Sequence, residues 1–399
     1  MRYISLFSGI GGLESRKHKP IILCEKNKSC IEYLRSEYKN SEIYDDIKKL
    51  TKKNFKLPKV DLVSGGWPCQ DISVAGEKKG FNGEHSVLFY DLIKVAKKSK
   101  AESIVAENVP NLLTLFDGEI FSSVLNELSS AGYPFISWRI INTREFNIPH
   151  QRRRVFIVAS KNEQKAKNLF NPIKKQVKKS TKEIEVFGFY HTAGTHSICY
   201  SKNFVPTLKV SGSGPAIFYQ NTIRRLTPSE SLLLQGFKPS KFKGISDTHI
   251  YSMTGNAVSK PVGEFIFSSL ENDVKEIKAT PLNQKEIFGD EYSLPKKYPH
   301  NGFFKKNAIY EINLKPANLC SNLSDFIDFK CNDYLSDTAI LGLIRRAFKA
   351  DKKINSNLLD AMISILTINT IDSEIGENNI LKLYENKREN KIQSDELIF

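Results

Sequence analysis

The sequence has 399 residues, of which 40% are hydrophobic and 26% are charged, and its formal net charge at pH 7 is +15. This length and composition predict a globular protein of two or three domains, with neither a bilayer-spanning stretch nor a signal-peptide layout. The six cysteines form no CxxC pair, which argues against a structural zinc site or a disulfide framework and favours a reducing, cytoplasmic setting. The excess of lysine and arginine favours nucleic acid over membrane as a partner.

The first 160 residues alternate short apolar runs with amphipathic segments. Strands are expected at 3–8, 20–26, 60–66, 102–109, 134–143 and 153–160, and helices at 29–38, 87–98 and 120–133. This alternation predicts an α/β fold with a mostly parallel sheet covered on both faces. Ligands of such sheets bind beyond the carboxyl ends of the strands, where this chain carries "FSGIGG", "CEKN", "GGWPCQ" and "ENVPNL".

The pattern changes after Ser160. Lysines crowd 161–182, and the following residues to about 220 are rich in glycine, serine, threonine and aromatic residues, as in a small, loop-rich inserted unit. Helices are expected again at 226–237 and 263–273. Beyond about residue 275, helices are expected at 336–350 and 355–370 and a strand at 308–315. We therefore expect three parts: a first domain (1–160, completed by 250–275), an inserted domain (161–249), and a helical accessory domain (276–399) that packs on the first.

The glycine turn "FSGIGG" is suited to a nucleotide-like ligand. It does not complete the dinucleotide fingerprint, because Glu14 stands where a third glycine would be. An adenosine-bearing ligand without a pyrophosphate fits this turn, and S-adenosylmethionine is the obvious one. Glu25 follows a strand at the distance where an acid binds ribose hydroxyls, and Asp46 could take an adenine amino group. Each feature alone is equally typical of ordinary glycine loops and surface acids.

Cys69 stands in a stiff, narrow loop. A free thiol has a pKa of about 8.5, so a cysteine that attacks a substrate needs an electropositive, partly exposed site. Pro68 restricts the backbone, and Gly65 and Gly66 leave room for a flat substrate. Glu107 ends the next strand, so it should share the rim of the sheet with Cys69 and could hydrogen-bond a ring nitrogen. The alternative is an inert core cysteine, which this loop does not favour.

Taken in order, these segments resemble the DNA (cytosine-5)-methyltransferases of bacterial restriction–modification systems. The resemblance covers about residues 1–270 and rests on "FSGIGG", "CEKN", "DDI", "GGWPCQDIS", "VLFYDLI", "ENVPNL", "IPHQRRRVFIVAS", "RRLTPSESLLLQGF" and "YSMTGNAVSKPVG". It implies a Rossmann-like, S-adenosylmethionine-dependent methyltransferase domain with a mostly parallel sheet, a small target-recognition domain and a C-terminal extension.

The resemblance also implies a mechanism. Cys69 would attack carbon 6 of a cytosine flipped out of a short, specific double-stranded site, and Glu107 would hold the pyrimidine edge. Arg152 and Arg154 would brace the flipped base and its phosphate. Extruding a base costs a few kcal/mol, which contacts to the duplex must offset. Carbon 5 would then take the methyl group, and in a restriction–modification system this mark protects host DNA.

The resemblance assigns further residues by their position in the motifs. The cofactor S-adenosylmethionine would contact Phe7, Gly9, Gly11, Gly12, Glu25, Asp46, Ile47, Pro68, Asn256 and Val258. The residues expected to contact DNA are Gln70, Ser73, Thr207, Lys174, Lys175 and Arg225. Three positions depart from the family pattern: Lys26 replaces an aromatic residue, His150 a glutamine and Leu233 an arginine.

Other readings stay open at this point. An RNA-acting relative would methylate a tRNA cytosine, but the "CFT" element usual in that branch does not occur here. A catalytically silent DNA-binding relative typically lacks the thiol or the acid, whereas Cys69 and Glu107 are both present. The expected partners are double-stranded DNA and a restriction endonuclease acting on the same site, with no membrane and a monomeric chain. No metal is expected.

Overall fold

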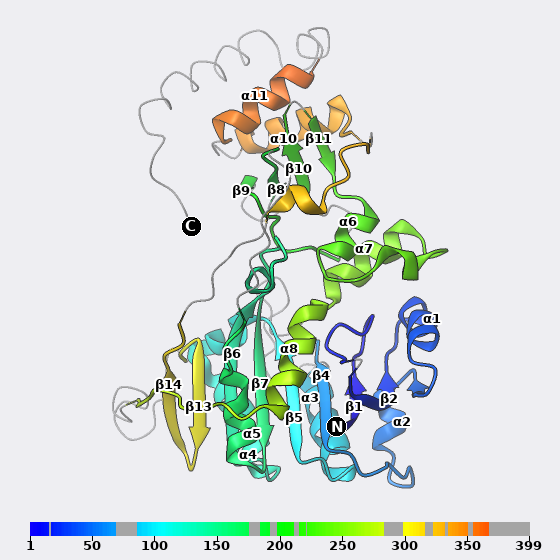
Figure 1. Ribbon diagram of the computed structural model, residues 1–399. Helices are drawn as coiled ribbons and strands as arrows, with labels where there is room; N and C mark the ends of the chain where they lie inside the picture. The colour runs from blue at the N-terminus through cyan, green and yellow to red at the C-terminus, as the bar shows by residue number, and fades with distance from the viewer. Residues whose placement is uncertain are drawn as a thin grey trace.

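The computed structural model describes residues 1–15, 17–68, 86–174, 184–191, 198–210, 215–220, 222–282, 298–315, 322–331, 334–349 and 354–366. Cys69, Gln70, Ser73 and Lys175 lie outside these ranges. Figure 1 shows a large sheet with flanking helices at the bottom and a smaller sheet with the helices α10 (Asp337–Lys349) and α11 (Ser356–Ile365) at the top. The helices α6 (Pro228–Leu233) and α7 (Asp247–Asn256) lie between the two sheets. No helix in the described parts combines the length and apolar character needed to cross a membrane.

The large sheet has ten strands among the described residues, in the order β12-β14-β13-β6-β7-β5-β4-β1-β2-β3. Their bounds are β1 Arg2–Leu6, β2 Lys19–Cys24, β3 Glu42–Tyr44, β4 Leu62–Gly66, β5 Ser103–Asn108, β6 Phe135–Asn142, β7 Arg153–Ser160, β12 Ala279–Pro281, β13 Asn301–Lys305 and β14 Ala308–Ile312. The five neighbours from β3 to β5 are parallel, and β7 is inserted antiparallel between β5 and β6. The predicted α/β fold with a mostly parallel sheet is confirmed.

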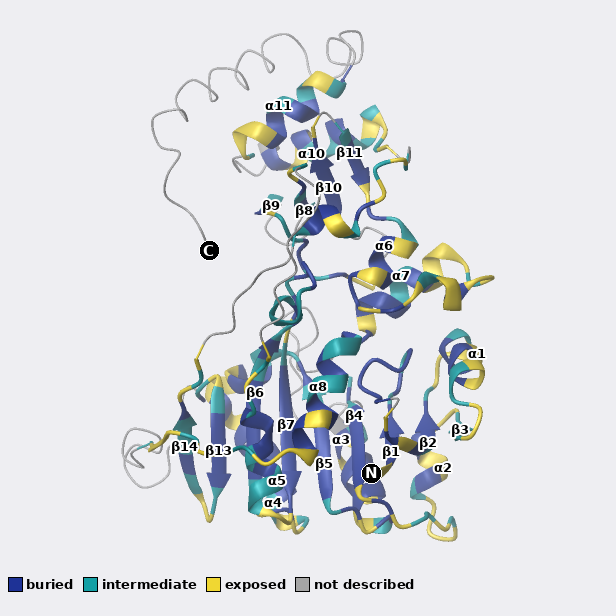
Figure 2. Cartoon of the chain, viewed as in Figure 1, coloured by how far each residue is buried: buried dark blue, intermediate teal, exposed yellow. Residues whose placement is uncertain are grey.

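Helices cover both faces of this sheet because its central strands are apolar on both sides. Ile4 and the α3 residue Phe89 belong to one core cluster, together with side chains of α2 and α4. The preceding residue of the strand, Tyr3, points to the other face and packs edge-on against Phe267 of α8, with ring centroids 4.8 Å apart. Figure 2 shows the central strands as buried. The helices of this unit are α1 Lys28–Glu37, α2 Ile47–Thr51, α3 Ser86–Lys98, α4 Glu119–Ser130, α5 Glu163–Lys167 and α8 Lys260–Glu271.

The inserted unit is built on a second, antiparallel sheet of four strands in the order β11-β10-β8-β9. These strands are β8 Phe187–His191, β9 Ile198–Lys202, β10 Ala216–Tyr219 and β11 Thr222–Arg225. The helices α6 Pro228–Leu233 and α7 Asp247–Asn256 follow and lie between the two sheets (Figure 1). The sequence suggested a loop-rich unit here, because its short strands are separated by glycine- and serine-rich segments.

The C-terminal part differs from the expected helical accessory domain. Its first segment adds β13, β14 and β12 to the edge of the large sheet, where β13 pairs antiparallel with β6. Gly302 makes this approach possible, because a Cβ there would come 2.1 Å from the Trp138 ring. The helices α10 Asp337–Lys349 and α11 Ser356–Ile365 occur within the segments predicted to be helical, but they pack on the small sheet rather than on the large one.

Candidate active site

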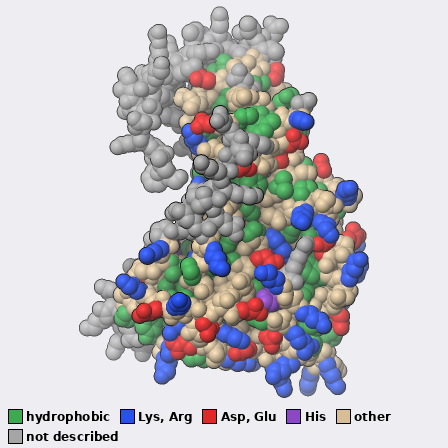
Figure 3. Space-filling model, viewed as in Figure 1, with side chains coloured by type: hydrophobic (Ala, Val, Ile, Leu, Met, Phe, Trp, Pro, Cys, Tyr) green, Lys and Arg blue, Asp and Glu red, His purple; other side chains and the backbone are tan. Residues whose placement is uncertain are grey.

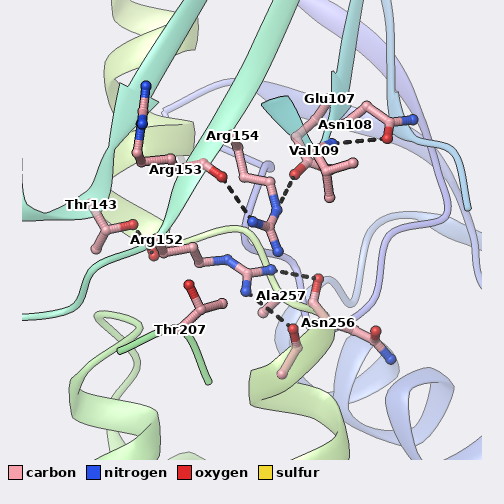
Figure 4. A network of polar contacts seen from close by, with 12 residues as sticks. Glu107, Asn108, Val109, Thr143, Arg152, Arg153, Arg154, Thr207, Asn256 and Ala257 are labelled. Atoms are coloured by element: carbon pink, nitrogen blue, oxygen red, sulfur yellow. Dashed lines mark hydrogen bonds and ion pairs between the residues drawn. The ribbon is translucent and has the colours of Figure 1, made fainter. Parts of the chain in front are cut away.

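Two catalytic candidates meet where β5 ends and β7 begins. Glu107 stands at the end of β5, and the neighbouring antiparallel strand β7 carries Arg154. The Arg154 Nε lies 3.0 Å from the Glu107 Oε1, and the Arg154 guanidinium also donates to the Arg153 carbonyl at 2.8 Å (Figure 4). The guanidinium is therefore held from two sides, and it presents the carboxyl group of Glu107 at the rim of the sheet.

The Glu107 side chain is only 13% exposed, and two opposite effects act on the pKa of its carboxyl group. Burial disfavours the charged form and raises the pKa above its usual value, while Arg154 and Arg152 oppose that rise. The net direction is upward. Gly66 leaves the necessary space, because a Cβ at that position would come 2.5 Å from the Glu107 Oε2. A carboxyl group whose pKa is raised in this way can donate a proton as well as accept one.

Asn108 ties this corner to the loop that contains Cys69. Its buried side-chain amide donates to the Trp67 carbonyl at 3.3 Å and its Oδ1 accepts from the Val109 N–H at 2.8 Å. Trp67 is itself buried and packs against Phe89 of α3. The described chain ends at Pro68 on this side of the loop, so the position of the Cys69 thiol stays a prediction. Its backbone entry point is nevertheless fixed beside Glu107.

Arg152 has a different environment from Arg154. Its side chain is buried and donates to the carbonyls of Gly255 at 3.2 Å and Asn256 at 3.4 Å, at the end of α7 (Figure 4). Arg152 thereby joins the arginine strand to the segment that follows α7. The described geometry thus gives Arg152 a bridging contact, and a contact with a flipped base stays a prediction.

The loop after β1 forms an open cradle. Phe7 and Gly9 both have positive φ angles, 55° and 54°, and a Cβ on Gly9 would meet no atom within 4 Å. The Gly9 N–H donates to the Glu25 Oε2 at 2.7 Å, and the Asn27 N–H donates to the other carboxylate oxygen at 2.8 Å. Glu25, at the end of β2, therefore holds the loop in shape from the neighbouring strand.

A segment far along the chain closes this cradle from behind. A Cβ on Gly12 would come 1.9 Å from the Val258 carbonyl oxygen, so only glycine permits the contact. The Lys260 ammonium donates to the Gly11 carbonyl at 2.8 Å. The structure thus brings residues of the first motif and of the last motif together, as the resemblance implies.

The remaining cofactor candidates lie on other segments, and Pro68 among them is half-buried at the end of the described part of its loop. Asp46 is exposed and caps α2, since its Oδ1 accepts from the Lys48 N–H at 2.9 Å. Ile47 behind it is buried, whereas the Asn256 side chain is exposed. Among the described residues, no group of three histidine, cysteine or acidic side chains is placed to hold a metal ion.

The DNA candidates are divided between the two units. The Thr207 hydroxyl donates to the Gln151 carbonyl at 2.6 Å, so it fastens the inserted unit to the arginine strand. Arg225 is exposed at the end of β11, and Lys174 is exposed after α5. Gln70, Ser73 and Lys175 lie outside the described residues.

His150 is buried between the two units. The Leu208 N–H donates to its Nε2 at 3.1 Å, so the proton is on Nδ1, which lies 3.1 Å from the Leu234 carbonyl. Its side chain is fully buried, and burial together with Arg152 lowers the pKa of His150 well below its usual value. The imidazole is therefore neutral, and it joins the segment before β7 to Leu208 and to Leu234 at the end of α6.

Sequence reasoning missed a buried ion pair beside these residues. The Arg224 guanidinium and the Glu230 carboxylate face each other at 2.9 Å and 2.7 Å, and both side chains are almost fully buried. Glu230 also accepts from the Thr227 N–H, and Thr227 in turn accepts from the Glu230 N–H, which makes a capping box. The T-x-x-E spacing was the available signal. Leu233, in the same helix, is 39% exposed.

The chain was compared with known protein families and with known proteins. Residues 1–212 and 188–272 match the family described as C-5 cytosine-specific DNA methylase. The chain is 31% identical over 298 residues to the type II methyltransferase M2.BsuMI of Bacillus subtilis (strain 168), covering 68% of this chain and 75% of that protein. It is 29% identical over 306 residues to M.Bsp6I of Bacillus sp. (strain RFL6), covering 66% of this chain and 96% of that protein.

A solved structure supports the fold. The S. pombe Dnmt2 methyltransferase superposes with a TM-score of 0.50 and 18% sequence identity, covering 68% of this chain and 98% of that one. The predicted resemblance is confirmed by the family match, which spans more than half of the sequence. The chain belongs to the C-5 cytosine-specific DNA methylase family and is a DNA (cytosine-5)-methyltransferase.

Proposed function

We propose that this enzyme transfers a methyl group from S-adenosylmethionine to carbon 5 of a flipped-out cytosine in a short, specific double-stranded DNA site. The observation that carries the proposal is the Glu107–Arg154 pair, whose N–O distance is 3.0 Å, at the rim where Asn108 anchors the start of the Cys69 loop. A buried carboxyl group with a raised pKa, next to an arginine, is suited to protonating and gripping one edge of a pyrimidine.

The proposed reaction begins with the Cys69 thiolate, which forms a bond to carbon 6 of the extruded cytosine. The protonated Glu107 carboxyl group gives its proton to N3, so the electron pair of the C5–C6 double bond becomes available at carbon 5. Carbon 5 then accepts the methyl group. A solvent base then takes the carbon 5 proton, and the electron pair of that C–H bond restores the C5–C6 double bond as the thiolate leaves, while N3 returns its proton to Glu107.

S-adenosylmethionine supplies an electrophilic methyl group when bound, and the glycine loop fits such a ligand. The open space beside Gly9 and the two backbone N–H groups, of Gly9 and Asn27, that donate to Glu25 support the close approach of a ligand to this loop. Both Glu25 oxygens keep a second lone pair that can accept from ribose hydroxyls. The residues proposed to hold the cofactor are Phe7, Gly9, Gly11, Gly12, Glu25, Asp46, Ile47, Pro68, Asn256 and Val258.

The inserted unit, within 161–249, is proposed to read the DNA, with the remaining DNA contacts made from the large unit. The net charge of +15 supports a duplex as substrate, and lysine and arginine side chains are spread over the face of the large unit seen in Figure 3. Two relatives are named type II methyltransferases. We therefore propose that the mark protects host DNA from an endonuclease that acts on the same site.

The test is to express the chain in a host without cytosine methylation and to sequence the bisulfite-treated host DNA. One short recurrent motif with 5-methylcytosine at one position supports the proposal, and it must disappear with Cys69→Ser. Labelled methyl transfer to purified duplex DNA and to tRNA provides the second arm. Transfer to tRNA without transfer to DNA, or an absence of any transfer, would contradict the proposal.

A further inference from the structure

Residues 322–366 lie beyond the part of the chain that matches the family, which ends at residue 272. Their described residues nevertheless pack on the small sheet, at the top of Figure 1. We call the small sheet together with these residues the small unit. This segment comprises a short 3₁₀ helix, Leu323–Phe326, followed by α10 and α11. We call its described residues the C-terminal brace. The function of the brace is not explained by the chemistry at Glu107, which is located on the large sheet.

The brace packs on both faces of the small sheet. Along β10 the side chains alternate, so that Phe218 belongs to one apolar cluster and Ile217 to the other. Helices α10 and α11 cover the first face, where Ile340, Leu341 and Met362 are fully buried. The brace residues buried on the second face are Leu323 and Ile327. The small sheet is therefore enclosed by the brace, since these apolar side chains would otherwise meet water.

The brace also makes backbone contact with the edge of the small sheet. The Leu335 N–H donates to the Ile223 carbonyl of β11 at 3.0 Å, and Tyr334 forms an antiparallel bridge with Arg224. β11 is an edge strand of the sheet, so these contacts use backbone groups that would otherwise lack a partner strand. The brace thus holds the strand that ends in Arg225.

The peptide groups on either side of the Asp328 Cα complete the buried ion pair. The Asp328 N–H donates to the Glu230 Oε1 at 2.8 Å, and the Asp328 carbonyl accepts from the Arg224 guanidinium at 3.0 Å. With the Thr227 N–H at 2.8 Å, each Glu230 oxygen then accepts two hydrogen bonds. A buried ion pair is tolerated only when its other donors and acceptors are also paired, so the brace completes this one.

Arg224 of the buried ion pair is followed in the sequence by Arg225, which is proposed to contact DNA. Arg225, the neighbour of Arg224, lines a crevice together with Lys209 and Tyr251. The Tyr251 hydroxyl donates to the Leu226 carbonyl at 2.6 Å, which fixes the backbone just after Arg225. Two exposed cations, Lys209 and Arg225, therefore line one crevice, and the brace contacts the two residues that precede Arg225. Two cations placed in this way are suited to DNA phosphates.

We propose that the C-terminal brace is a positioning element for DNA binding, which acts through the Asp328 backbone and the Arg224–Glu230 pair to set the place of Arg225 against a DNA phosphate. This inference rests on the proposed function, because it requires the small unit to contact duplex DNA. It assigns a role to a part of the chain outside the family match, and it makes that role separable from cofactor binding and chemistry.

The test compares two substitutions of one residue. Asp328→Pro removes the N–H that donates a hydrogen bond to Glu230. Asp328→Ala keeps both peptide groups and loses only the side chain, which accepts a hydrogen bond from the Lys330 N–H. Ile327 has φ −103° and ψ 134°, a conformation that a following proline permits. We expect Asp328→Pro to weaken binding to an unmethylated mixed-sequence 40-base-pair duplex roughly five- to tenfold, about 1.4 kcal/mol per tenfold. Asp328→Ala should bind as the unmodified enzyme does.

A double-mutant cycle with Arg225→Ala identifies the route. If the brace acts through Arg225, Asp328→Pro should have little further effect on the dissociation constant in the Arg225→Ala background. The logarithm of the binding constant falls linearly with the logarithm of the salt concentration. In both single variants this negative slope should become shallower by about one, as the loss of one phosphate contact predicts. The KM for DNA should rise while S-adenosylmethionine affinity and kcat stay near the unmodified values, a division that general destabilisation would not produce.

A second variant covers the case in which Asp328→Pro fails to fold, shown by loss of S-adenosylmethionine binding. Phe329 packs edge-on against the Tyr219 ring, with centroids 4.9 Å apart, and the Tyr219 hydroxyl accepts from Arg224. Phe329→Ala should then give the same non-additive loss with Arg225→Ala. The inference would be overturned if the brace variant and Arg225→Ala raised the dissociation constant for DNA independently, so that their effects multiplied in the double variant. Equal DNA affinity of Asp328→Pro and Asp328→Ala would also overturn it. An unmodified enzyme that methylates no DNA would instead count against the proposed function.

Discussion

Arg154 and Glu107 form an ion pair across two antiparallel strands, with the Arg154 Nε 3.0 Å from the Glu107 Oε1. Burial drives the pKa of the carboxyl group upward, and the two neighbouring arginines oppose that shift. The same side chain can therefore be held in place as an anion and still take up a proton when a substrate nitrogen competes for it. The balance between the charged and the protonated form of Glu107 therefore depends on Arg154.

Arg154→Ala should lower kcat on duplex DNA by about 10²-fold, in the range that positioned acid catalysis contributes. Arg154 is the main group that opposes the effect of burial on the pKa of Glu107, so this pKa should rise further when Arg154 is removed. Since the reaction uses the protonated form, the limb of the pH–rate profile that falls with increasing pH should move to higher pH. The measurement is kcat against pH under saturating DNA.

Arg153→Ala is the matched control for that profile. Arg153 is exposed and contributes only its backbone carbonyl to the Arg154 guanidinium, a contact that alanine keeps. Its pH–rate profile should coincide with that of the unmodified enzyme. If Arg154→Ala leaves the profile in place, the Glu107 carboxyl group is not the acid that the ion pair tunes.

Gly9→Ala should weaken S-adenosylmethionine binding about tenfold, because the added methyl group enters the open cradle at a positive φ angle. Gly132→Ala is the control, since Gly132 also has a positive φ and free space but lies in the turn after α4. Both variants bear a backbone cost of about 1–2 kcal/mol. Titration calorimetry should therefore show lower cofactor affinity for Gly9→Ala alone. Equal affinity of the two variants would exclude the cradle as the cofactor site.

His150→Gln should make the stability of the chain less sensitive to acid. Burial lowers the folded-state pKa of His150, so as the pH falls below the unfolded value of about 6.5, protons bind the unfolded chain preferentially. The stabilisation by the neutral imidazole is thus complete above that pH and is lost below it, by up to about 1.4 kcal/mol per pH unit. Urea unfolding at pH 7.5 and 5.5 should show a smaller difference in His150→Gln than in the unmodified chain. The exposed His249→Gln is the control and should respond as the unmodified chain does.

Arg224→Ala should lower the free energy of unfolding by about 3–5 kcal/mol, because it leaves the buried Glu230 carboxylate without its cation. Lys49→Ala removes the cation of another ion pair, the exposed i,i+4 pair with Asp45, and should leave the unfolding midpoint nearly unchanged. The measurement is the free energy of unfolding from urea denaturation. The dependence of this free energy on urea concentration should be equal in the two variants, so that their midpoints can be compared. A loss for Arg224→Ala as small as that for Lys49→Ala would show that the buried pair does not hold the small unit together.

The sequence was informative where local patterns decide the structure. Apolar runs that end in glycine or in an acid predicted β1, β2, β4 and β5 and the loops after them, because a strand buried on both faces needs continuous apolar residues. The Gly12 contact with Val258 could be anticipated only through the resemblance, since 246 residues separate the two positions. No local pattern marks the pairing of β13 with β6, which depends on an edge strand accepting a partner from much later in the chain.

Other parts of the site could not be predicted for a related reason. The T-x-x-E spacing indicates the cap at Thr227, but it does not reveal that Glu230 also binds Arg224 and the backbone of Asp328. Likewise, Thr207 was expected to contact DNA and His150 only to replace a glutamine of the family pattern, and neither expectation indicated that both residues tie the two units together. Polar side chains acquire such contacts from tertiary packing, which a single sequence does not record.

The most direct test uses a duplex that carries the site identified by sequencing, with 5-fluorocytosine at the methylated position and S-adenosylmethionine present. Fluorine cannot leave carbon 5 as a proton does, so the Cys69 sulfur should stay bonded to carbon 6. We expect a DNA–protein species that survives denaturing electrophoresis, with mass spectrometry locating the bond at Cys69, and none with Cys69→Ser. Methylation of the ordinary site without any trapped species on the fluorinated one would contradict nucleophilic attack by Cys69.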